Sequence, residues 1–85
     1  MNGNKLMFIN NDNIETLKLT GMIKNPEISF YPDKNGYVLF FSFTGSDADE
    51  WELKPFTIRD EPYYFSSERV IRSYCIDKGF TEVKF

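Results

Sequence analysis

A run of six residues holds four carboxylates and the only tryptophan of the chain, and it reads Asp47-Ala48-Asp49-Glu50-Trp51-Glu52. Two more acids, Asp60 and Glu61, follow a few residues later. An aromatic anchor surrounded by negative charge is typical of a surface that binds a basic partner, because tryptophan dominates binding hot spots and acids steer association. The competing interpretation is a solvated acidic loop in which Trp51 anchors the core.

Metal binding and hydrolysis are two further interpretations of the same run. Asp47, Asp49 and Trp51 fall at the first three ligand positions of an EF-hand-like loop, but an indole cannot ligate Ca²⁺. The run also lacks a glycine at the sixth position, and Ile58 stands where a bidentate glutamate is needed. Paired carboxylates can hydrolyse glycosides, yet nothing in this short chain indicates a sugar cleft. We therefore expect no metal, no cofactor and no catalytic residues.

Aromatic side chains make up 18% of the chain, and a compact group of them, Pro62-Tyr63-Tyr64-Phe65, precedes a predicted helix. These rings could dock a peptide or stack on bases, or they could fasten the start of the helix to the sheet. Together with the acidic run they complete the predicted partner-binding set, which is Asp47, Asp49, Glu50, Trp51, Glu52, Asp60, Glu61, Tyr63 and Tyr64.

The composition excludes most enzyme chemistry. The 85 residues include no histidine and one cysteine, Cys75. Imidazole bases, Ser-His-Asp catalysis and histidine metal ligands are therefore excluded, as are an internal disulfide and a cysteine-cluster zinc site. We expect Cys75 to be a small core residue, because no histidine is present to activate it. The protein is predicted not to be an enzyme.

The charge balance narrows the choice of partner and compartment. Thirteen acids oppose ten bases, which gives a net charge of −3, and the lysines and arginines are scattered singly. Because phosphate neutralisation drives nucleic-acid affinity, direct binding to nucleic acids is disfavoured, and so is binding to anionic membranes. No apolar stretch has the length of a signal-peptide core or a membrane span, and a lone cysteine suits a reducing compartment. We expect a cytoplasmic protein.

The first third of the chain predicts a hairpin. An apolar run at Lys5–Ile9 is followed by the turn residues 10–13, and residues Glu15–Ile23 then alternate with period two. We interpret 15–23 as a half-buried strand. A helix capped by Asn13 is the competing prediction, and it would place Gly21 inside the helix, where glycine is unfavourable.

The middle of the chain predicts a second hairpin and one further strand. Glu27–Tyr31 and Tyr37–Thr44 flank a turn in which Asn35-Gly36 supplies positive φ angles. The start of Tyr37–Thr44 is apolar on both faces, as in a central strand. Trp51–Ile58 is another strand, and its phase slips at Pro55, which predicts a bulge or an edge position there.

The end of the chain predicts a helix at about 66–78. Ser66 or Ser67 caps it, an apolar stripe runs along it, and Lys78-Gly79 ends it. Residues 60–62 form a turn before it, and Phe80–Phe85 alternates as a last strand. The predicted fold is a single α+β domain over 1–85, with a meander-like antiparallel sheet of five to six strands and one helix on one face.

The leading functional hypothesis is a non-enzymatic binding protein that occludes a surface of a protein partner with basic character. The small, acidic, aromatic-rich and motif-free chain resembles in type the small proteins of phages and mobile elements. That likeness implies an inhibitor of a nucleic-acid-binding host protein. The alternatives are a self-associating homodimer and a single-stranded nucleic-acid binder that uses an aromatic sheet face.

Overall fold

A computed structural model describes residues 8–45 and 50–85. A three-stranded antiparallel sheet has the order β1-β2-β3, and a separate two-stranded hairpin, β4–β5, follows it. The fold is therefore α+β as predicted, although the main sheet is smaller than the five to six strands expected. The elements in chain order are α1 (Ile14–Leu19), β1 (Ile23–Tyr31), β2 (Gly36–Phe43), β3 (Glu52–Pro55), β4 (Thr57–Ile58), β5 (Glu61–Pro62) and α2 (Glu68–Asp77).

The predicted strand at 15–23 is wrong, because the chain forms the short helix α1 there. Ile14 and Leu17 are buried with helical spacing, whereas Leu19 is 85% exposed. The helix ends at the C-cap Thr20, so Gly21 lies beyond it with φ +77 and does not interrupt it. The competing helix prediction overlooked this early end.

The asparagine cluster starts the helix instead of closing a hairpin. Asn10 Oδ1 accepts hydrogen bonds from the backbone N–H groups of Asp12 and Asn13 at 2.9 and 3.0 Å. Asn13 is the N-cap residue, but its side chain bonds Asn10 N and Phe8 O and does not cap the helix. Ile9 makes a single bridge to Phe56, and residues 5–7 of the predicted first strand lie outside the described residues.

The hairpin β1–β2 is confirmed, and β2 is the central strand. Its turn covers residues 32–35, one fewer than the predicted 32–36, and Pro32–Lys34 forms a 3-10 turn before Asn35 takes a left-handed φ of 50. Gly36 is already the first residue of β2, and its role is different from the predicted one. A Cβ atom placed on it would lie 2.9 Å from Tyr64 Cβ. Gly36 therefore lets the 63–65 segment approach the sheet.

The predicted strand Trp51–Ile58 is divided into β3 and β4 at Phe56, next to the predicted slip at Pro55. The predicted turn at 60–62 is displaced, because Arg59 and Asp60 carry the positive φ angles and Glu61–Pro62 forms β5. The last predicted strand, 80–85, is reduced to one bridge between Lys84 and Glu27.

Helix α2 agrees with the predicted boundaries. Ser67 Oγ accepts the N–H of Val70, Lys78 is the C-cap, and Gly79 follows with φ +93. Ile71 and Cys75 are fully buried, whereas Val70, predicted on the apolar stripe, is 46% exposed. Phe80 packs back at 5.1 Å from the ring of Phe41.

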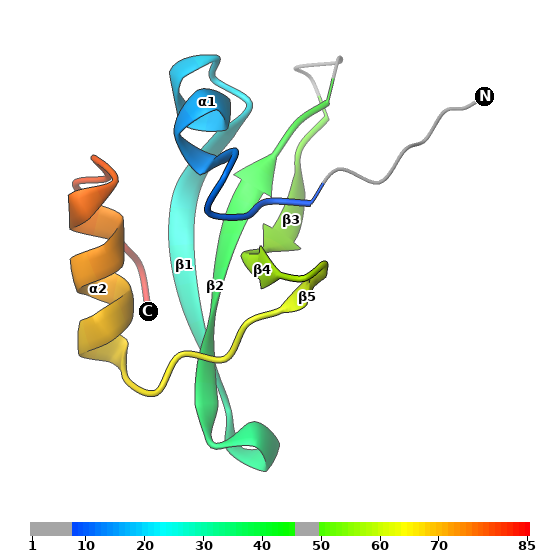
Figure 1. The fold of residues 1–85 in the computed structure, drawn as a ribbon. Coiled ribbons are helices and arrows are strands. Elements are labelled where there is room, and N and C mark those ends of the chain that lie inside the picture. Colours follow the sequence, from blue (N-terminus) through cyan, green and yellow to red (C-terminus); the bar gives the residue numbers. More distant parts are fainter. Residues whose placement is uncertain (1–7, 46–49) are drawn as a thin grey trace.

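Both helices lie on one side of the sheet, where they form a single core with it. Figure 1 shows α2 beside β1 and α1 across its upper part, whereas β3 and the β4–β5 hairpin lie on the other side of β2. The β1–β2 hairpin extends beyond the lower end of α2 (Figure 1). The core contains residues from all these layers, namely Ile9, Ile14, Leu17, Ile23, Ile28, Leu39, Phe41, Phe43, Phe56, Phe65, Ile71, Cys75 and Phe80.

The close approach at Gly36 generates a stability prediction. Gly36→Ala would force the new methyl group against Tyr64 Cβ at 2.9 Å and Phe65 O at 3.3 Å, neither of which is a flexible chain end. We expect the free energy of unfolding in urea to fall by about 1–3 kcal/mol. Gly45→Ala is the matched control, because nothing lies within 4 Å of its added Cβ. Equal stability of the two variants would show that the 63–65 segment does not depend on this contact.

Candidate binding surface

The sheet has a second face that no described helix covers. Side chains alternate along β2, so Leu39, Phe41 and Phe43 point into the core and Val38, Phe40 and Ser42 point the opposite way. We call this second side the open face. An exposed sheet face normally carries polar residues, as β1 does here with Lys24, Glu27 and Ser29, but β2 and β3 add Phe40 and Leu53.

The strand register extends the open face across three strands. Phe40 lies between Glu27 on β1 and Pro55 on β3, and Ser42 lies between Lys24 and Leu53. Leu53 is 51% exposed. Val38 is only 1% exposed although no described helix lies above it, so the centre of the face is covered.

Trp51 lies at one end of the open face, next to Leu53. The ammonium of Lys24 stands 4.2 Å from the centre of the indole ring, which is a cation–π contact. Trp51 is 36% exposed and is absent from the core cluster. The interpretation of Trp51 as a core anchor is therefore wrong.

Two tyrosines lie at the opposite end of the open face. Tyr31 pairs with Gly36, and its ring meets that of Tyr64 edge-on at 6.0 Å. The ammonium of Lys34 lies 5.9 Å from the Tyr64 ring centre. The six-residue step from Gly36 to Ser42 separates the two aromatic ends by about 20 Å.

The predicted partner-binding residues are only partly brought together. Trp51 and Tyr64 share the open face, whereas Tyr63 packs on Phe56 and Phe65 at 6.5 and 4.8 Å, on the core side. Glu52 pairs with Phe43 and therefore points, by alternation, to the side opposite Leu53. Asp47 and Asp49 lie outside the described residues.

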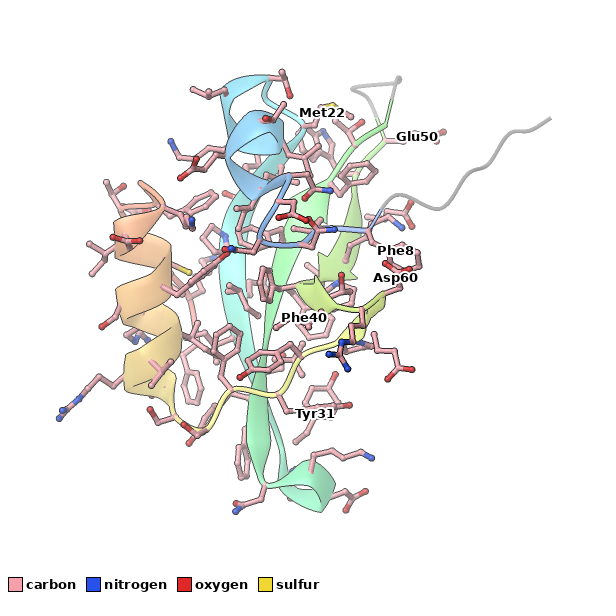
Figure 2. All side chains as sticks on the ribbon, in the orientation of Figure 1. Phe8, Met22, Tyr31, Phe40, Glu50 and Asp60 are labelled. Carbon is pink, nitrogen blue, oxygen red and sulfur yellow. The ribbon has the colours of Figure 1, made fainter. Side chains whose placement is uncertain are left out.

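The remaining predicted acids lie near β3 and the hairpin. Glu50 and Glu52 are exposed next to Trp51, and Asp60 and Glu61 are exposed at the β4–β5 turn. Figure 2 shows Glu50 and Asp60 on the same side of the molecule, away from α2. These carboxylates therefore border one region without forming a single cluster.

Sequence reasoning missed Lys24 and Leu53 of the open face, whereas it considered Tyr31 and Phe40 only as part of an aromatic sheet face that stacks on single-stranded nucleic acid. The apolar second parity of β2, with Val38 and Phe40, correctly predicted a central strand but was not used to predict a binding surface. The register that brings Leu53 and Lys24 to either side of Ser42 is not encoded in any local pattern.

Within residues 8–45 and 50–85, no group of three or more Cys, Asp or Glu side chains could hold a metal ion. Nor does this described part of the chain contain a helix long and apolar enough to cross a membrane.

Burial disfavours ionisation of the two titratable side chains of α2 that face inward, Tyr74 and Cys75. It raises the pKa of the Cys75 thiol from 9.0 to about 11. Burial, followed by the nearby negative groups on Cys75, Glu15 and Asp77, raises the pKa of Tyr74 to about 12. The Tyr74 hydroxyl donates to Asn11 Oδ1 at 2.8 Å. Both groups stay neutral near pH 7, which suits packing and not nucleophilic chemistry.

No protein-family model matches this sequence, and neither the curated proteins nor the solved structures contain a match to it.

The raised pKa of Cys75 predicts an unreactive thiol. At pH 8 the folded protein should react with a thiol reagent at least about 100-fold more slowly than the urea-unfolded chain, because two pKa units separate their thiolate fractions. The unfolded thiol ionises from about pH 9 and the folded one from about pH 11, so the free energy of unfolding should fall between these values. Cys75→Ala should lack this contribution. Fast labelling of the folded protein at pH 8 would contradict the buried position.

Proposed function

We propose that this chain is a non-enzymatic binding protein that docks on a protein partner through its open face and occludes the surface it covers. The observation that carries the proposal is the apolar character of the open face, with Trp51, Leu53, Phe40 and the tyrosine pair Tyr31 and Tyr64. Several exposed apolar residues on one face are informative, whereas single exposed apolar residues are not. Two of its residue types, tryptophan and tyrosine, are those most enriched at binding hot spots.

The partner we propose presents a basic surface. Glu50, Glu52, Asp60 and Glu61 are exposed around β3 and the β4–β5 turn, and none of them forms an ion pair within the described part of the chain. Such carboxylates would speed encounter with a positive surface. Proteins that bind nucleic acids carry such surfaces, so inhibition of a nucleic-acid-binding protein by occlusion fits this charge pattern.

The edge strand β3 is poorly suited to self-association by edge-to-edge pairing. β3 is a four-residue edge strand, and Pro55 cannot donate a backbone hydrogen bond. The N–H of Phe56 donates to Leu39 O, so by alternation the backbone groups of residues 53 and 55 point away from β2. Because proline has no N–H, Leu53 supplies the one outward N–H group of β3 that an added strand could use. Short edges interrupted by proline resist pairing.

Leu53→Ser tests the docking role of the open face. The wild-type protein is immobilised and exposed to nuclease-treated lysate, and the captured partner is then purified. We expect Leu53→Ser to weaken its affinity by about tenfold or more, the scale of a hot-spot residue. Ile76→Ser is the matched control, because Ile76 is 69% exposed on α2, away from the open face.

Two results would contradict the proposal. The first is equal loss of affinity in Leu53→Ser and Ile76→Ser, or loss in neither. The second is a wild-type dimer in light scattering that Leu53→Ser dissociates, because a second copy would then cover the open face. Since Trp51 is the only tryptophan, its fluorescence reports contact at this face directly.

A further inference from the structure

A pocket of about 210 Å³ opens beside the apolar part of the open face. Its lining residues come from β1, β2 and the segment after α2, and they are Asn25, Pro26, Glu27, Ser42, Glu82 and Lys84. Ser42 also lies on the open face, between Lys24 and Leu53, so the pocket borders the open face.

An irregularity in β1 creates this pocket. The register with β2 shifts between Lys24 and Glu27, and Asn25 takes a positive φ of 57. The segment after α2 then pairs with the outer edge of β1. Lys84 N–H donates to Pro26 O at 3.0 Å, and Lys84 O accepts from Ile28 N–H at 2.7 Å. This pairing fixes Glu82 and Lys84 next to Glu27.

The charges around the pocket favour a cation. Neither Glu27 nor Glu82 forms an ion pair within the described residues, where the two ion pairs are Arg72–Glu68 and Lys78–Glu15. Lys24, the nearest cation on β1, is placed over the Trp51 ring. Lys84 is then the one cation of the pocket lining against two carboxylates.

We infer that this pocket receives an arginine side chain of the partner, next to an apolar residue that packs on Phe40 and Leu53. The inference rests on the proposed function. Arginine fits better than lysine, because its planar guanidinium can donate to two carboxylates and its flat faces pack on apolar surface. The partner surface is thus specified as an arginine adjoining an apolar side chain.

Two short peptides test this inference without knowledge of the partner. The probe is acetyl-Arg-Leu-Arg-Leu-amide, and the matched peptide contains citrulline, which keeps the shape of arginine and removes its charge. Binding is measured by backbone amide NMR shifts and by Trp51 fluorescence. We expect the arginine peptide to bind at least about tenfold more tightly and to shift residues 24–27, 42 and 82–84.

Charge-neutral variants then locate the cation. The double variant Glu27→Gln with Glu82→Gln should remove the difference between the two peptides. Glu61→Gln, on the β4–β5 turn, is the control and should preserve it. Lys84→Gln should tighten binding of the arginine peptide, because it removes the competing positive charge.

The outcomes separate this inference from the proposed function. Equal affinity for both peptides, or no binding of either at millimolar concentration, overturns the arginine pocket. If both peptides bind equally and Leu53→Ser weakens both, the pocket fails while docking on the open face stands. If the charge variants act as expected but Leu53→Ser has no effect, the proposed docking face fails instead. Tighter binding of an oligothymidine at low salt would also overturn the inference, since it would make the face a nucleic-acid platform.

Discussion

The rest of the structure depends on the burial of one face of β2 beneath two helices. Leu39 and Phe41 have no exposed surface, and they contact a core that reaches from α1 to Phe80. Within residues 8–45 and 50–85, both helices lie on this core side of the sheet and no helix lies on the other side. The opposite face is covered only in part, because Val38 at its centre is buried whereas Leu53 is half-exposed. That it carries Trp51, Leu53 and Phe40 is the reason to look for function there.

Local sequence patterns predicted the elements that depend on a few neighbouring residues, namely helix α2 and the β1–β2 turn. Ser67 and Gly79 delimit α2, and Asn35 takes the left-handed conformation of the β1–β2 turn, because caps and turns depend on single residues. The strand predicted at 15–23 failed for a physical reason. Thr16, Lys18 and Thr20 mimic a polar strand face, but burial of Ile14 and Leu17 selects a helix and leaves Leu19 in water. Tertiary packing decided between two periodicities that a nine-residue window cannot separate.

The candidate surface was less predictable than the fold. Residues adjacent in sequence were grouped as one site, yet alternation sends Trp51 and Glu52, and likewise Tyr63 and Tyr64, to opposite sides of the sheet. The residues that do meet come from separate segments of the chain, as Lys24 on β1 and Trp51 just before β3 show. Composition drew attention to the tryptophan, but only the strand register shows what lies beside it.

Two lysine–aromatic contacts hold the basic residues at the ends of the open face. Lys24 over Trp51 and Lys34 over Tyr64 place their charges at the aromatic ends of the face. Glu27 lies between these ends in the row of Phe40, and it forms no ion pair within the described residues. Glu27 and Glu82, with Lys84 beside them, thus lie toward β1, whereas Leu53 lies on β3. A partner that matched this pattern would place its cation off-centre, toward β1, and its apolar contacts toward β3. Such a pattern of charged and apolar positions discriminates between partners better than net charge does, because a positive charge of the partner placed over either lysine would be repelled.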